Sequence, residues 1–74
     1  MKQEQIIKIK TEYIKLDQLL KFAGIAESGG MAKEIIMSGD VFVNGEKCEI
    51  KGKKIRKNDE ISLDEIIIKV ESEI

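Results

Sequence analysis

The sequence predicts an α+β fold in which two short helices pack on one side of a small mixed β-sheet. Apolar residues recur with helical spacing between residues 16 and 39, and they alternate with polar residues outside that stretch. An Asn-Gly pair at 44–45, a strong local sign of a two-residue hairpin, follows the second helical segment. The expected element order is β-α-α-β-β-β-β. Residues 1–74 are expected to form one domain, because a chain of 74 residues builds only a small core.

The first part of the chain predicts a half-buried strand and then a helix. Ile7 and Ile9 alternate with lysines, while residues 1–5 are polar and are expected to be frayed. The helix is expected to end at Gly24, because glycine often follows the last helical turn. Its buried face is formed by Leu16, Leu19, Leu20 and Ala23.

The second helix is expected to begin after Ser28 and to end at Gly39. The hydroxyl of Ser28 can accept a hydrogen bond from a free backbone N–H at the start of the helix. The buried face of this helix consists of Ala32, Ile35 and Ile36.

Four short strands are expected after the second helix. Val41 and Val43 point one way from the first, and residues 46–50 are expected to pair back on it after the Asn-Gly turn. The other two strands are expected at 60–63 and 66–70. Further side chains expected in the core are Phe22, Phe42, Cys48, Ile50, Ile55 and, at least in part, Tyr13.

The residue inventory argues against an enzyme. Cys48 is the single cysteine and there is no histidine, so neither an internal disulfide nor a zinc site is expected. The sequence contains neither a phosphate-binding P-loop nor a dinucleotide fingerprint. We therefore expect no catalytic residue, no metal and no cofactor. No apolar run could span a bilayer and no signal-peptide pattern is present, so a cytoplasmic protein without a membrane partner is expected.

The net charge is −1, but the charges are unevenly distributed. Residues 47–57 contain six basic side chains and one acid, whereas residues 59–74 contain six acids and one base. Salt screens exposed charges beyond about 8–10 Å, so a local patch matters more than the net charge. This asymmetry predicts a basic binding face opposite an acidic rear. The six basic residues are Lys47, Lys51, Lys53, Lys54, Arg56 and Lys57.

Residues 16–45 carry an ordered series of motifs. The series runs Leu-Asp, Leu, Gly, a serine-led helix with an alanine, Gly, and Val-x-Val-Asn-Gly. Its members are Leu16, Asp17, Leu20, Gly24, Ser28, Ala32, Ile36, Gly39, Val41, Val43, Asn44 and Gly45. This series resembles the S4 RNA-binding domain. Gly29, Gly30 and Lys33 add a resemblance to the small stand-alone S4-like proteins of bacteria, although Gly29 departs from the broader family, in which an arginine is common there.

The resemblance implies an S4-like fold with the αL motif and a non-catalytic protein that contacts phosphates of structured RNA. It implies ribosomal RNA or a ribosome-associated partner as the target class. Two glycines in a first helical turn cost about 1 kcal/mol each relative to alanine, and bare amides there could approach a phosphate. A permissive helix entry and a solvated lysine loop are the alternatives. The expected RNA-binding residues are Ser28, Gly29, Gly30, Lys33, Lys51, Lys53, Lys54 and Arg56, with Lys21 and Lys57 at the border.

Two other functions are left open by the sequence. A β-grasp sulfur carrier also combines a Val-x-Val-Asn-Gly-Glu hairpin with a leucine-rich helix, but it needs a C-terminal di-glycine, whereas this sequence ends Glu-Ser-Glu-Ile. The acidic rear could alternatively serve a protein-interaction module. The oligomeric state is open, although an exposed strand edge could pair.

Overall fold

The computed structural model describes residues 3–73, which form seven strands and two helices. The strands β1 to β7 are Gln3–Ile9, Ile14–Lys15, Val41–Val43, Glu46–Lys47, Lys54–Ile55, Glu60–Leu63 and Ile66–Ser72. The helices are α1, Leu16–Phe22, and α2, Gly29–Met37. Residues 1–2 lie outside the described part of the chain, and the expectation of frayed ends is wrong for residues 3–5, which belong to β1.

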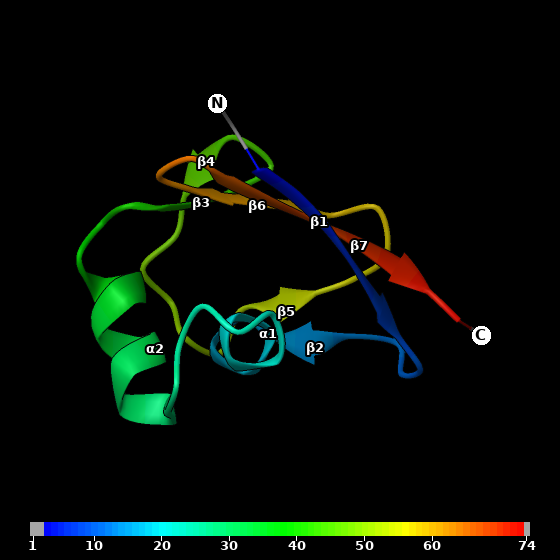
Figure 1. The fold of residues 1–74 in the computed structure, drawn as a ribbon, viewed down its shortest axis with the longest axis horizontal. Coiled ribbons are helices and arrows are strands. Elements are labelled where there is room, and N and C mark those ends of the chain that lie inside the picture. Colours follow the sequence, from blue (N-terminus) through cyan, green and yellow to red (C-terminus); the bar gives the residue numbers. More distant parts are fainter. Residues whose placement is uncertain (1–2, 74) are drawn as a thin grey trace.

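Five of the strands form one mixed sheet with the order β1-β7-β6-β3-β4. β1 runs parallel to β7, whereas the other pairs in this sheet are antiparallel. Figure 1 shows this sheet on one side of the molecule, with α1 and α2 on the other. The expected α+β class is confirmed. The tertiary structure adds β2 and β5, which pair antiparallel beside α1 and form a second, two-stranded sheet.

Both helices have the ends that the sequence predicts. Ser28 Oγ accepts a hydrogen bond from the Met31 N–H at 3.1 Å, so the N-cap of α2 is confirmed. Gly24 and Gly39 follow the two helices with φ angles of +79° and +89°, which favour glycine because it has no Cβ.

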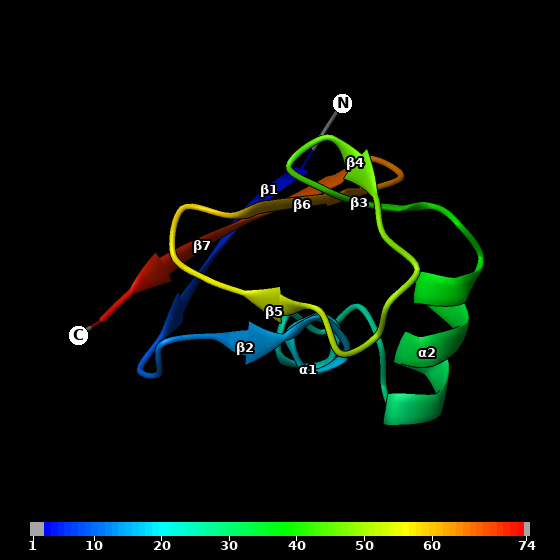
Figure 2. The same cartoon turned by 180° about the vertical axis from the view of Figure 1, so that it is seen from behind.

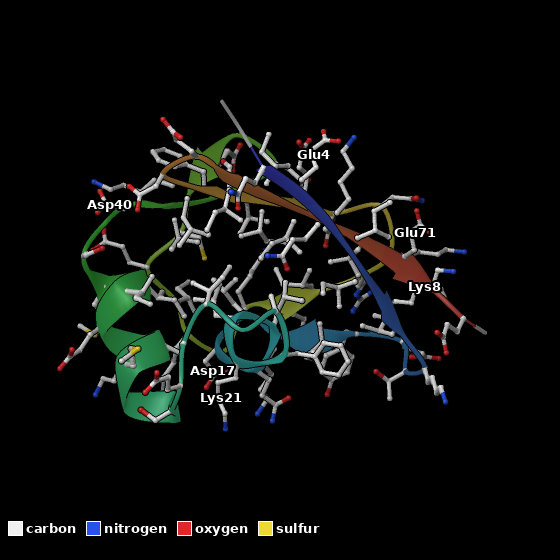
Figure 3. All side chains as sticks on the ribbon, in the orientation of Figure 1. Glu4, Lys8, Asp17, Lys21, Asp40 and Glu71 are labelled. Atoms are coloured by element: carbon white, nitrogen blue, oxygen red, sulfur yellow. The ribbon has the colours of Figure 1, made fainter. Side chains whose placement is uncertain are left out.

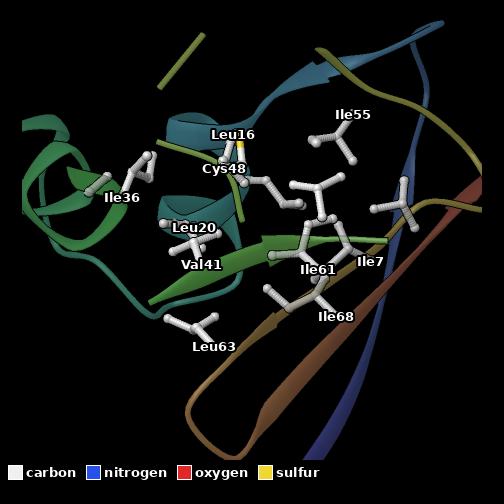
Figure 4. Packing of buried hydrophobic residues seen from close by; sticks show 14 of the residues in the cluster. Ile7, Leu16, Leu20, Ile36, Val41, Cys48, Ile55, Ile61, Leu63 and Ile68 are labelled. Atoms are coloured by element: carbon white, nitrogen blue, oxygen red, sulfur yellow. The ribbon is translucent and has the colours of Figure 1, made fainter. Parts of the chain in front are cut away.

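The core is aliphatic and lies between the five-stranded sheet and α1. The described residues bury no charged or polar side chain fully, and Figure 4 shows the α1 leucines packed against residues of the sheet. Aromatic side chains contribute nothing to the buried cluster. The largest side chains with almost no exposure are Leu16, Leu19, Leu20, Ile36, Ile55, Ile61 and Ile68, together with Val41 and Val70.

The side chains of Phe22, Phe42 and Ile50 are exposed, although the sequence predicts them in the core. Phe22 is 67% exposed because its position on α1 turns it away from the leucine stripe. Phe42 is 38% exposed because it lies between Val41 and Val43, which take the core face of β3. Ile50 is 65% exposed because β4 ends at Lys47 and the chain then leaves the sheet, so strand alternation no longer applies.

The β3–β4 hairpin turn is held from outside by the turn that precedes β6. Asn44 and Gly45 have φ angles of +51° and +86°, as a type I′ turn requires. The Asn44 side-chain NH₂ donates to Asp59 Oδ1 at 3.0 Å, and its carbonyl oxygen accepts from the Glu60 N–H at 2.9 Å. The Asn44 side chain therefore stabilises both its own left-handed backbone and the contact between two turns.

We expect Asn44→Ala to lower the free energy of unfolding by about 2 kcal/mol, because it removes two hydrogen bonds and leaves a left-handed residue without a favoured side chain. Urea denaturation followed by circular dichroism measures this loss. Asn58→Ala is the matched control, since Asn58 has a φ of +72° but no side-chain hydrogen bond to any of residues 3–73. Equal losses in the two variants would show that the Asn44 side-chain bonds contribute nothing.

Candidate nucleic-acid interface

Four of the six residues of the basic segment predicted from the sequence line one open hollow, whereas Lys51 and Lys57 do not. This open hollow of about 890 Å³ lies between the β3–β4 hairpin and the chain segment that leads from β4 through β5 toward β6. In Figure 2 that segment faces the viewer and passes in front of α1. The cationic residues that line the hollow are Lys47, Lys53, Lys54 and Arg56.

The basic bend at 51–53 is held in place through its backbone. The N–H groups of Leu16 and Asp17, in the first turn of α1, donate to the carbonyl oxygens of Lys53 and Lys51 at 2.9 and 3.1 Å. These bonds satisfy two of the amides that every helix leaves free at its start. The lysine carbonyls therefore cap α1, while their side chains remain exposed at the surface.

β5 anchors the other end of the bend. Ile55 is fully buried, and β5 pairs with β2 so that Ile14 lies opposite Ile55 and Lys15 opposite Lys54. Because side chains alternate along a strand, Lys54 and Arg56, on either side of Ile55, point toward solvent. The buried isoleucine thus orients the two cations on either side of it.

The cations of the hollow are free to take an external anion. No carboxylate of residues 3–73 lies within ion-pair distance of Lys47, Lys53, Lys54 or Arg56. The ammonium group of Lys54 lies 4.9 Å from the centroid of the Tyr13 ring, a cation–π contact that orients it without neutralising it. Tyr13 is exposed and lies outside the buried cluster, so the expectation that it belongs at least in part to the core is wrong.

One acid of the hollow is occupied by contacts within the fold. Asp59 accepts a hydrogen bond from the Arg56 N–H at 2.8 Å through one carboxylate oxygen and from Asn44 through the other. Its charge is thereby committed to backbone and side-chain donors. The remaining acids at the rim are Glu46 and Glu49, both of which are exposed.

The start of α2 forms a second, separate group of predicted residues. Ser28, Gly29, Gly30 and Lys33 are all exposed, and none of them lines the basic hollow. The N–H groups of Gly29 and Gly30 have no acceptor among residues 3–73. In both Figure 1 and Figure 2 the start of α2 and the bend at 51–53 lie on the side of the molecule away from the five-stranded sheet. The two groups therefore share one end of the molecule without forming one pocket.

The fold itself does not require glycine at positions 29 and 30. Neither residue has a positive φ, and a Cβ added at Gly29 would meet no atom within 4 Å. A Cβ at Gly30 would meet only Ser28 Oγ, at an ordinary contact distance of 3.9 Å. Gly52, in the basic bend, is equally unconstrained. These three glycines differ from Gly24, Gly39 and Gly45, all of which have a positive φ.

Lys21 and Lys57, which the sequence places at the border of the site, lie on different parts of the surface. Figure 3 shows Lys21 of α1 pointing away from the sheet, at the end of the molecule where α2 begins. Lys57 does not line the basic hollow and instead lines a small one with Thr11 and Glu12. Lys57 is therefore a weaker candidate than Lys21.

Lys47 is a lining residue that the sequence-based site did not include. A Cβ at Gly39 would lie 2.9 Å from Lys47 Cε and 3.2 Å from its Nζ, so the bare backbone after α2 makes room for this side chain. A cation at that place also complements the negative end of the helix dipole. The signal in the sequence was the place of Lys47 among the six basic residues of 47–57, in the strand that follows the hairpin turn.

The groups exposed at this interface are suited to binding anions. Residues 3–73 hold no group of three or more His, Cys, Asp or Glu side chains placed to bind a metal ion. Neither α1 nor α2 is long and apolar enough to cross a membrane. The chemistry available at the interface consists of ammonium groups, a guanidinium group and free backbone amides.

Comparison with known proteins identifies relatives of this chain. The model of the S4 domain matches residues 7–71. A protein of Bacillus subtilis (strain 168) named "probable ribosome maturation protein RlbA" is 40% identical over 58 residues, which cover 78% of this chain and 82% of that protein. "Hemolysin A" of Brachyspira hyodysenteriae is 40% identical over 50 residues, 68% of this chain but only 21% of that longer protein. The match over residues 7–71 and the likeness to the Bacillus protein along most of its length show that this chain belongs to the S4 domain family.

Proposed function

We propose that this protein is a non-catalytic RNA-binding protein that grips the phosphates of structured RNA at the end of the molecule formed by the start of α2 and the basic bend. The observation that carries the proposal is the combination of free amides at two glycines with cations that have no carboxylate partner in residues 3–73. Membership of the S4 family supports RNA as the polyanion.

The start of α2 is suited to a phosphate oxygen. The N–H groups of Gly29 and Gly30 point out of the first turn, where the helix dipole favours a negative charge. Without a Cβ at either position, a phosphate can approach the backbone closely. Lys33 follows about one turn later and supplies a cation on the same exposed part of the helix.

The basic hollow is suited to neighbouring phosphates. Lys53, Lys54 and Arg56 provide charge at spaced points along one open surface, which is how proteins follow a nucleic-acid backbone. The three aromatic residues lie on separate segments, Tyr13 before β2, Phe22 in α1 and Phe42 in β3, unlike the successive stacking side chains of proteins that bind unstacked bases. Folded or double-stranded RNA is therefore the favoured ligand, because A-form RNA is recognised mainly through its backbone and shape.

The proposed cellular target is ribosomal RNA or a ribosome-assembly intermediate. The support for this step is the name of the Bacillus relative, which describes a probable ribosome maturation protein. Membership of the S4 family favours RNA binding over a β-grasp sulfur carrier, since that alternative depended on a hairpin and helix that the S4 match also covers. A protein-interaction role of the acidic residues is compatible with RNA binding elsewhere on the surface.

The glycines provide a sharp test, because stability and binding should change in opposite directions. We expect Gly29→Ala and Gly30→Ala each to raise the free energy of unfolding by up to about 1 kcal/mol, since alanine is the better helix former and its Cβ meets no obstacle. The same variants should bind a folded RNA hairpin several-fold more weakly, because the methyl group keeps the phosphate away from the amides.

Urea denaturation measures the stabilities, and fluorescence anisotropy with a labelled hairpin measures the affinities. Gly24→Ala is the control, because its φ of +79° predicts the reverse pattern of lower stability and unchanged affinity of the folded protein. More stable variants of Gly29 and Gly30 with undiminished affinity would remove the start of α2 from the interface.

A charge reversal tests the basic bend. We expect the double variant Lys53→Glu with Lys54→Glu to weaken RNA binding by more than about tenfold and to flatten the dependence of affinity on salt, because two phosphate contacts become repulsive. Lys10→Glu with Lys69→Glu makes the same change in net charge on β7 and next to β1, and it should have a much smaller effect. If both double variants lose affinity equally, only overall charge matters and the proposed site is wrong.

A further inference from the structure

β1 has an open edge. It is the first strand of the sheet, it pairs only with β7, and no other described segment pairs with its outer side. Ile6, at the middle of this seven-residue strand, is 57% exposed, an unusual degree for an isoleucine in a sheet. An edge strand presents unpaired N–H and C=O groups to any strand that can lie beside it.

The hydrogen bonds at the two ends of β1 show which residues present their backbone to that edge. The Gln3 N–H donates to the Glu65 carbonyl at 2.6 Å, and the Ile9 carbonyl accepts from the Glu73 N–H at 2.8 Å. Both residues thus turn their backbone groups toward β7. Because the backbone direction alternates along a strand, Glu4, Ile6 and Lys8 turn theirs toward the open edge.

These three residues make the edge complementary to itself. In an antiparallel pair of two β1 strands centred on Ile6, each Ile6 lies opposite its copy, and each Glu4 lies opposite Lys8 of the other chain. In this register the outward-facing N–H and C=O groups of each β1 strand lie opposite outward-facing N–H and C=O groups of the other, as an antiparallel ladder requires. Shifting the register by two residues would place Glu4 or Lys8 opposite Ile6 and lose both charge pairs.

The positions of the β1 side chains are compatible with this antiparallel pairing. Glu4, Ile6 and Lys8 are all exposed and lie on the face of β1 that points away from the core, whereas Ile7 and Ile9 are buried. Figure 3 shows Glu4 and Lys8 on the same side of β1, near its two ends. Glu4 forms an ion pair with Lys69 at 3.4 Å, while Lys8 forms none within residues 3–73.

We propose that β1 is a homodimerisation edge, at which a second copy of this chain adds its own β1 antiparallel in the register that pairs Ile6 with Ile6 and Glu4 with Lys8. Charged residues on an edge strand usually oppose pairing with other strands. Here the opposite charges at symmetric positions exclude other partners and registers while they favour the chain's own copy. The dimer would join two five-stranded sheets into one, and it does not depend on the proposed RNA binding.

Exchanging the charges tests the register. Glu4→Lys alone and Lys8→Glu alone each place like charges opposite one another in the homodimer, so both variants should dimerise about tenfold more weakly than the unchanged chain. An equimolar mixture of the two variants should form a heterodimer, because each pair across the interface is then opposite in charge. Sedimentation velocity of the full chain without RNA, over a concentration series into the millimolar range, measures all three dissociation constants.

Two controls separate pairing from folding. Glu34→Lys changes the charge on the exposed surface of α2, away from β1, and should leave dimerisation unchanged. Urea denaturation of each variant accounts for the loss of the Glu4–Lys69 ion pair and for the proximity of Lys8 to Glu71 on β7. Weakened homodimers with a restored mixture support the edge. A monomeric unchanged chain throughout the series, single variants that dimerise as well as it does, or a mixture no tighter than its components would each overturn it.

Discussion

The packing of α1 under the five-stranded sheet is the constraint on which the other features depend. Leu16, Leu19 and Leu20 are fully buried, so this one short helix supplies a large part of a core that contains no aromatic side chain. In a domain of this size each buried leucine contributes a substantial part of the total stability, because replacing one with alanine costs about 2–5 kcal/mol. Burial of these leucines therefore fixes the position of α1, and the polar segments next to α1 are positioned relative to it.

The basic bend adapts by capping α1 with its backbone. The carbonyl oxygens of Lys51 and Lys53 accept hydrogen bonds from the N–H groups at the start of α1. Moving the bend would break these bonds and leave the N–H groups without an acceptor. The same lysines keep their ammonium groups at the surface. Backbone and side chain thus serve different purposes, and the cationic surface is rigidly attached to the core although it consists of exposed side chains.

The six glycines divide into two groups by physical role. Gly24, Gly39 and Gly45 have positive φ angles and are required where helices and a hairpin end or turn. Gly29, Gly30 and Gly52 have neither such angles nor a neighbour that a Cβ would strike. All three lie at the proposed interface, where an absent side chain exposes backbone to a ligand. Glycine lowers helix and loop stability at these three positions, and no backbone angle or steric contact within the fold requires it there.

Local patterns in the sequence determined the helices, the serine cap, the hairpin turn and the leucine face, because capping, turn chemistry and periodicity involve residues close in the chain. Hydrophobicity alone was misleading for Phe22, Phe42 and Ile50, where the direction of the backbone outweighs the preference of the side chain for burial. Composition located the basic segment. Only the tertiary structure decided the parallel pairing of β1 with β7 and the contact of Tyr13 with Lys54, because each joins residues that are distant in the chain and meet only after the core has formed.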